Sequence, residues 1–168
     1  MDLKQLLLEQ VEQEATLTRK AIDRVPDGHN DFKPHERSMA LGHLAALVAS
    51  MLGWIPLMVE RDELNLDDPS SEIFKNKQAT TKAELIQMLD DGIAGARRAL
   101  AATNEEHLLT SWRFINGGRI VAEKPRYIMI TDAVFSHLAH HRGQLTVYLR
   151  LNEASVPALY GPSADEMQ

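Results

Sequence analysis

The chain has 168 residues and a net charge of −6, with 18 Lys and Arg against 24 Asp and Glu. This length predicts a single domain over residues 1–168, and the acidic balance argues against a nucleic-acid partner, because Lys and Arg supply most of the affinity for phosphate. The sequence contains no cysteine, which excludes disulfides, thiolate metal sites and a cysteine nucleophile and fits a reducing compartment such as the cytoplasm.

The first two long helical segments are predicted over residues 2–24 and 38–60. In the first segment, apolar residues from Leu3 to Ala15 recur at a spacing of four, which is typical of one helix face. Pro26-Asp27-Gly28 then ends the helix. In the second segment, Ser38 is a candidate N-cap and Pro56 is expected to kink or end the last turn.

Part of the second segment also has the length of a membrane span. Residues 39–59 contain no Asp, Glu, Lys or Arg, and about 20 such residues cross a bilayer. However, they include polar His43 and a proline, and single arginines at 37 and 61 flank them without the charge asymmetry of a membrane protein. We therefore expect the central helix of a soluble core and no membrane partner.

A long connection and two further helices complete the chain. Residues 61–79 are polar and acidic, and Asp67-Asp68-Pro69-Ser70-Ser71 is typical of a loop. This connection is longer than usual between bundle helices, so it could shield a site, but a solvent-exposed connection is the favoured interpretation. Helices are predicted over residues 81–102, which begin with a Thr81–Glu84 capping box, and over 126–151.

These elements predict the fold class. Four amphipathic helices of comparable length in one small domain indicate an all-α protein, a four-helix bundle. Between the third and fourth helices, Asn116-Gly117-Gly118 separates two runs of β-tolerant residues, which indicates a short hairpin or an irregular turn. The two prolines and the glycine after Asn152 predict a tail without helix.

Three of the seven histidines form a candidate metal site. His137 and His141 are four residues apart on the fourth helix, so they share a face and two imidazoles at that spacing can bind one ion. In a bundle, the second helix can face the fourth and bring His43 towards the pair. Three imidazoles leave a coordination position open, which is typical of catalytic sites.

Other interpretations of these histidines remain open. A single histidine on an apolar helix is often a hydrogen-bonded core residue, and an HxxxH pair alone is a weak metal motif. His140 lies to one side of the pair and is expected at the surface or supporting a ligand. The sequence has no HExxH motif and no Glu-x-x-His pair, which disfavours a zincin protease and a ferritin-like di-iron centre.

The residues that follow the pair have structural interpretations. Arg142 is expected to pair with a surface acid rather than to orient an anionic substrate, and Gln144 to hydrogen bond across helices. Gly143 lies inside a helix, where it costs about 1 kcal/mol relative to Ala, so we expect close helix packing there. Trp54 is predicted to be a core residue rather than one that stacks on a ligand.

The segment Ser136-His137-Leu138-Ala139-His140-His141-Arg142-Gly143-Gln144-Leu145 resembles the HxxxHRGQ signature of the DinB superfamily, the DinB/YfiT-like metalloenzymes. Gly42-His43-Leu44-Ala45 is similar to the GHL element of that family, and residues 156–165 resemble the tail of one of its branches. The resemblance implies a four-helix bundle with one divalent metal ion, usually nickel or zinc. The implied ligands are His43, His137 and His141, and several members form homodimers.

Two functional hypotheses follow from this resemblance. The first is a small-molecule metalloenzyme, a thiol-dependent transferase or a hydrolase, although no residue stands out as a general base and the substrate is not identified. The second is a non-enzymatic stress-response dimer whose metal is structural or incidental. An access channel to the metal favours the first hypothesis, and a sealed site with apolar contact across a symmetric interface favours the second.

Overall fold

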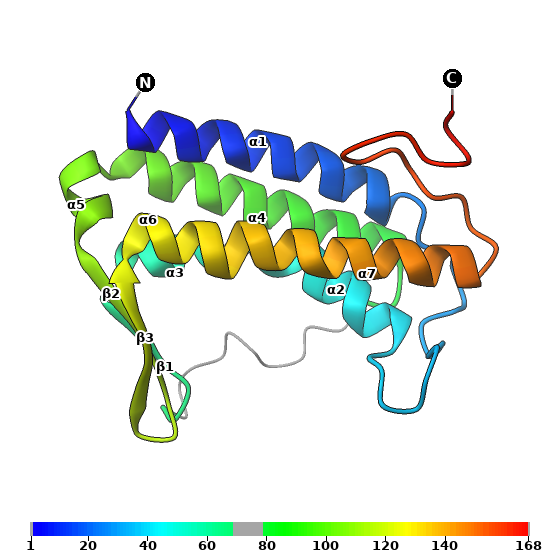
Figure 1. The fold of residues 1–168 in the computed structure, drawn as a ribbon, viewed down its shortest axis with the longest axis horizontal. Helices are drawn as coiled ribbons and strands as arrows, with labels where there is room; N and C mark the ends of the chain where they lie inside the picture. The colour runs from blue at the N-terminus through cyan, green and yellow to red at the C-terminus, as the bar shows by residue number, and fades with distance from the viewer. Residues whose placement is uncertain (1, 69–78, 168) are drawn as a thin grey trace.

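In the computed structural model, which describes residues 2–68 and 79–167, long helical segments pack side by side (Figure 1). Their positions confirm the four helical segments predicted from sequence periodicity, with ends that differ by a few residues. The segments are α1 (Leu3–Ile22); α2 (Leu41–Ser50) with the 3-10 turn η1 (Met51–Trp54) and α3 (Ile55–Glu60); α4 (Lys82–Ala102); and α6 (Arg126–Met129) with the π-helical η2 (Ile130–Ser136) and α7 (His137–Leu151).

The structure also contains a sheet, so the predicted all-α four-helix bundle is wrong and the chain is mixed α/β. Strands β1 (Glu63–Asn65), β2 (Ser111–Asn116) and β3 (Arg119–Pro125) form a three-stranded sheet in that order. Strand β1 runs parallel to β2, and β2 runs antiparallel to β3. The short helix α5 (Glu105–Leu109) connects α4 to β2.

The two parts of the sheet differ in how far local sequence specifies them. The β2–β3 hairpin confirms the prediction at Asn116-Gly117-Gly118, where both glycines adopt a positive φ that suits a tight hairpin turn. Strand β1 lies in the predicted loop over residues 61–79 and has only three residues, whose partners are distant in sequence. Such a short run carries no period of its own. The rest of that predicted loop, residues 69–78, lies outside the described residues.

The sheet lies at one end of the helices (Figure 1), and two side chains hold its parts in place. Arg126 is buried, where its Nε donates to Oγ1 of Thr110 at 2.9 Å and its Nη1 to the Met58 carbonyl at 2.8 Å. Just after the C-terminal end of β1, the Asp67 carboxylate accepts hydrogen bonds from the backbone N–H groups of Gly117 and Gly118, at 2.9 and 2.7 Å. The sheet is therefore held at both its root and its tip.

The core lies between the helices, with α4 against α1, η1 and α3, and α2 against α7. At the contact of α4 with η1, a Cβ built on Gly92 would lie 3.0 Å from the backbone nitrogen of Gly53, so the two backbones touch. Pro56 is the second residue of α3, in the first turn after the 3-10 turn η1, where a proline without a backbone N–H is tolerated.

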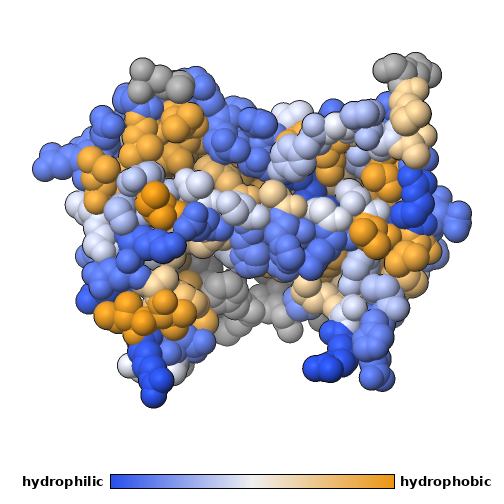
Figure 2. All heavy atoms as spheres, viewed as in Figure 1, coloured by the Kyte–Doolittle hydropathy of each residue, from blue (hydrophilic) through white to orange (hydrophobic). Residues whose placement is uncertain are grey.

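The helical stretch Leu41–Glu60 has the length and composition of a membrane span, yet most of it is buried within the structure. This burial is typical of the core helix of a soluble protein, as the sequence analysis expected. Figure 2 shows hydrophilic side chains over much of the face viewed, with apolar side chains in separate patches between them.

Candidate functional site

The site is built on the continuous helix formed by α6, η2 and α7. Its first histidine, His137, directly follows the π-helical segment η2, an interruption that the sequence prediction of one uninterrupted helix missed. Short π-helical segments are rare and occur frequently at functional sites. One turn later, His141 places its Nε2 atom 2.8 Å from Nε2 of His137, with the ring centroids 4.5 Å apart.

A hydrogen bond on the far side of the His141 ring fixes which of its nitrogens carries the proton. Nδ1 of His141 donates to Oε1 of Gln144 at 2.8 Å, while Nε2 of Gln144 donates to Nε2 of His140 at 3.1 Å. An amide oxygen only accepts, so Nε2 of His141 carries a lone pair. His137 is hydrogen bonded to the Ala133 backbone, and its Nε2 faces Nε2 of His141.

The two Nε2 atoms therefore face each other, at a separation that suits one hydrogen bond between the rings or, when neither atom carries a proton, one shared cation. A cation between the two Nε2 atoms would stabilise their lone pairs. A histidine that binds a metal through one ring nitrogen usually donates the N–H of its other ring nitrogen to an acceptor, as His141 does to Gln144. Gln144 has this supporting role within its own helix, so its predicted hydrogen bond across helices is wrong. His140 is exposed and supports Gln144, as expected of a residue beside the pair.

Partial burial lowers the pKa of both His137 and His141 below the usual value, although His137 as a whole remains open to solvent. The hydrogen bonds to the Ala133 backbone and to Gln144 act in the opposite direction and are weaker. Both rings are therefore held towards the neutral form at neutral pH, which is the form that binds metal ions.

His43 is not gathered into the same cluster. It is exposed on α2, a helix that packs against α7. Leu47 and Ser50 lie on the same, less buried face of that helical segment, and Trp54 follows one turn later. The Trp54 ring lies 6.0 Å from the ring of His137. Within residues 2–68 and 79–167, no three His, Asp or Glu side chains are close enough to hold one metal ion. The structure thus brings together His137 and His141, and the role of His43 as third ligand stays a prediction.

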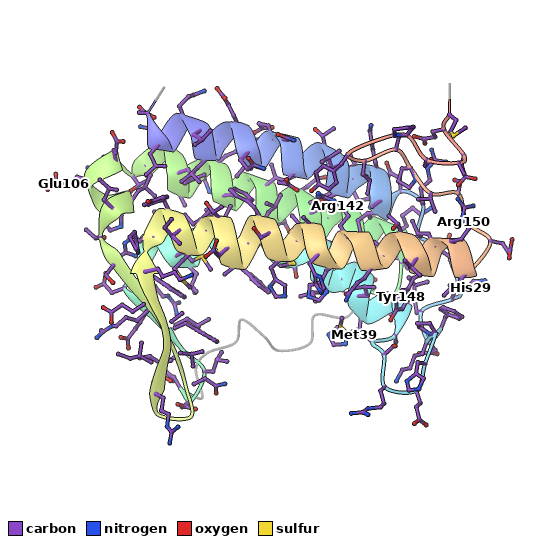
Figure 3. The ribbon with its side chains drawn as sticks, viewed as in Figure 1. His29, Met39, Glu106, Arg142, Tyr148 and Arg150 are labelled. Carbon is purple, nitrogen blue, oxygen red and sulfur yellow. The ribbon has the colours of Figure 1, made fainter. Side chains whose placement is uncertain are left out.

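The charge of Arg142 is buried, on the side of α7 that faces α1 (Figure 3). Its Nη2 donates to Oε2 of Glu14 at 2.6 Å and to the Tyr160 hydroxyl, and its Nη1 donates to Oγ1 of Thr18 at 2.9 Å. The predicted salt bridge is present, but its acid is buried rather than at the surface. Arg142 therefore joins α7 to α1 and to the C-terminal segment.

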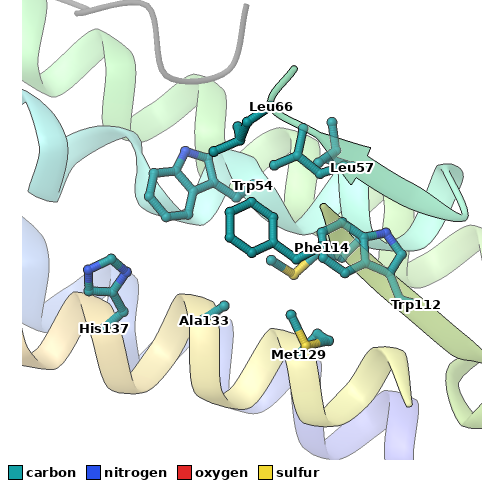
Figure 4. A pocket seen from close by; sticks show the side chains of 10 residues that line it. Trp54, Leu57, Leu66, Trp112, Phe114, Met129, Ala133 and His137 are labelled. Carbon is teal, nitrogen blue, oxygen red and sulfur yellow. The ribbon is translucent and has the colours of Figure 1, made fainter. Parts of the chain in front are cut away.

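A cavity of about 360 Å³ opens beside His137 (Figure 4). Trp54, predicted as a core residue, is largely buried and also forms part of the cavity wall. Three other lining residues were not predicted from the sequence: Ala133 on η2, in the same helix as His137, and Trp112 and Phe114 on β2, in the wall opposite that helix. The one local signal for them is the alternation of aromatic and polar residues from Ser111 to Phe114, which places both rings on one face of a strand.

Comparison with known proteins gives one family. The model of the DinB family matches residues 1–168. A DinB-like protein from Bacillus cereus is 21% identical, with a TM-score of 0.70 over 91% of this chain and 95% of that one. A DinB-like protein from Bacillus subtilis is 18% identical, with a TM-score of 0.67 over 94% and 99% of the two chains. A protein assigned to the same family from Exiguobacterium sibiricum is 23% identical, with a TM-score of 0.64 over 91% and 93%. No curated protein matches the chain.

Proposed function

The chain belongs to the DinB family, and from its paired histidines we propose that it is a metal-dependent enzyme that acts on a small molecule. The observation that carries this proposal is the 2.8 Å approach of Nε2 of His137 to Nε2 of His141, with Nδ1 of His141 hydrogen bonded to Gln144 and His137 hydrogen bonded to the Ala133 backbone. Two ring nitrogens held this close on one helix face offer two ligands to a single divalent ion.

The proposed ion is a single divalent metal, nickel or zinc, held by His137 and His141 with His43 as the third ligand. Imidazole nitrogens suit both metals, and the chain has no thiolate that would favour a closed structural site. A divalent ion with three such ligands acts as a Lewis acid on a donor group of the substrate. Gln144 and the Ala133 backbone orient the two ligand rings.

Access to the histidines favours an enzyme over a structural metal site. His137 is exposed and lines a cavity large enough for a small organic molecule. A structural site is normally closed by four protein ligands. The reaction class that we propose is thiol-dependent transfer or hydrolysis, in the cytoplasm.

The experiment is elemental analysis of untagged protein, followed by calorimetric titration of the metal-free protein with zinc and with nickel. We expect about one equivalent of metal per chain. His137→Ala and His141→Ala should each lose it, because the two imidazoles that remain hold a divalent ion much more weakly than three. The control is His35→Ala, which removes an exposed histidine from a loop outside the site.

Two results would contradict the proposal. One is a metal content that is unchanged in both His137→Ala and His141→Ala, which would show that the paired rings are not ligands. The other is a metal-loaded protein that turns over none of a panel of small thiols, electrophiles and esters faster than the free ion does, which would leave the metal without a catalytic role.

A further inference from the structure

The cavity beside His137 lies where the sheet meets the helices. Trp54 comes from η1, Trp112 and Phe114 from β2, and Met129 and Ala133 from the helix that continues into His137 (Figure 4). The sheet was absent from the fold predicted by sequence, and it supplies the wall opposite that helix. The cavity therefore exists only because β2 is held against the end of the helices, where the buried Arg126 fixes it.

Its lining has a single chemical character. Except for His137, all the side chains that line the cavity in the described part of the chain are aromatic, aliphatic or thioether groups, with no Lys, Arg, Asp or Glu among them. A charged group placed there would lose its hydration without a partner, which is costly. Aromatic rings and a methionine favour contact with a flat, polarizable group. The occupant is therefore an uncharged apolar group, preferably aromatic.

The size and the direction of the cavity refine this description. A volume of about 360 Å³ lies within the range of small-molecule sites and exceeds the bulk of a single ring. Met129, Ala133 and His137 follow one another at a spacing of four along the helix, and all three line the cavity. An occupant that extends along these three residues has one end at Met129 and the other at the imidazole of His137.

We propose that this cavity is the specificity pocket of the protein, which binds the uncharged, aromatic or similarly apolar body of the substrate and places its polar, reacting end at His137. The position of the reacting end rests on the proposed metal function. The binding of the apolar body does not, since it depends on the cavity wall alone.

The experiment uses the neutral fluorophore N-phenyl-1-naphthylamine as the probe. The chain has two tryptophans, Trp54 and Trp112, and both line the cavity. Binding there should therefore quench tryptophan emission and transfer excitation to the probe. Ala133→Phe, which fills the cavity from η2, should raise the dissociation constant at least tenfold. Ala139→Phe makes the same change on α7, beside a separate cavity next to Tyr160, and should leave the constant unchanged.

Two further measurements guard against misfolding of the filled variant and test the charge preference. Phe114→Ala removes part of the opposite wall without adding bulk, and should weaken the probe at least fivefold. The sulfonated analogue 1-anilinonaphthalene-8-sulfonate should bind the wild-type protein at least tenfold more weakly than the neutral probe. Equal binding of the two probes, or equal loss in Ala133→Phe and Ala139→Phe, would overturn the proposal.

The result is separable from that of the metal experiment. His141→Ala removes a proposed metal ligand that does not line the cavity, so it should bind the neutral probe as the wild type does. If the wild-type protein binds the probe at this cavity but takes up no metal in the titration, the pocket is supported and the metal function is refuted. Metal binding without energy transfer from the tryptophans would refute the pocket alone.

Discussion

At the scale of single residues, the buried charge of Arg142 is the feature with the largest expected effect on stability. Its side chain is fully buried, and Glu14, its acidic partner, is 3% exposed. Removing one member of a buried pair leaves the other charge without compensation, which typically costs 3–5 kcal/mol. The motif that contains Arg142 thus combines two functions, because the histidine before it faces the site and the arginine holds the helix to α1.

We predict that Glu14→Gln lowers the free energy of unfolding by about 3 kcal/mol, since the amide keeps a hydrogen bond but not the charge. The control is Glu12→Gln on the same helix, where Glu12 forms an exposed ion pair with Arg97, and the expected loss there is below about 1 kcal/mol. Both values come from urea denaturation followed by circular dichroism. Similar losses in the two variants would contradict the assignment.

At the scale of elements, two glycines inside helices have opposite surroundings. Gly92 on α4 touches the backbone of Gly53, whereas nothing lies within 4 Å of a Cβ built on Gly143 of α7. The close packing expected around Gly143 from its place in a helix is therefore wrong. Its small size serves no contact within the described part of the chain.

We predict that Gly143→Ala raises the free energy of unfolding by about 0.5–1 kcal/mol, because alanine favours the helix and reduces the freedom of the unfolded chain. Gly92→Ala should lower it by about 1 kcal/mol or more, because the added methyl group meets a backbone that cannot move aside cheaply. Thermal and urea unfolding of the two variants test this contrast. A destabilised Gly143→Ala would show that the face around Gly143 is covered in solution.

The C-terminal segment is a second element whose position depends on a few contacts. The Asp165 carboxylate accepts hydrogen bonds from Arg150 on α7 and from the backbone N–H of Val156, at 2.6 and 2.7 Å. The hydrogen bond from Arg150, followed by that from Val156, holds the pKa of Asp165 below its usual range. A lowered pKa in the folded state means that the carboxylate stabilises this segment above the usual pKa and loses that effect as pH falls.

We predict that the Val156 amide loses protection from hydrogen exchange as the pH is lowered below about 4, where free aspartate becomes protonated. Asp165→Asn should show the low protection already at neutral pH, because it cannot carry the charge. Asparagine does not titrate, so the protection of the Val156 amide in this variant should not fall further as the pH is lowered below about 4. The measurement is hydrogen exchange by mass spectrometry, corrected for the intrinsic pH dependence of exchange. A wild-type profile in Asp165→Asn would show that other contacts fix the segment.

At the scale of the whole molecule, the proposed site depends on how the helices and the sheet are arranged rather than on any one contact. The helix formed by α6, η2 and α7 carries both paired histidines. The sheet lies at one end of the helices and, with them, encloses the cavity beside His137 (Figure 1, Figure 4). The solved DinB-like structures share the fold at low sequence identity. The homodimer and the single domain predicted for residues 1–168 stay predictions.

The sequence by itself determined the features that depend on neighbours along the chain. Helix periodicity located the four helical segments, two glycines located the hairpin turn, and the spacing of four predicted that His137 and His141 share a face, where their rings now meet. Each of these features follows from backbone geometry within a few residues, so a local pattern suffices.

Only the tertiary structure decided the features that join distant residues. The pairing of β1 with β2, the burial of Arg142 against Glu14 and the cavity between Trp54, Trp112 and Ala133 each depend on the packing of segments far apart in the chain. The same is true of His43, whose distance from the pair depends on how α2 lies against α7. Such contacts leave no period in the sequence, because their free energy comes from surfaces that meet only after the chain has folded.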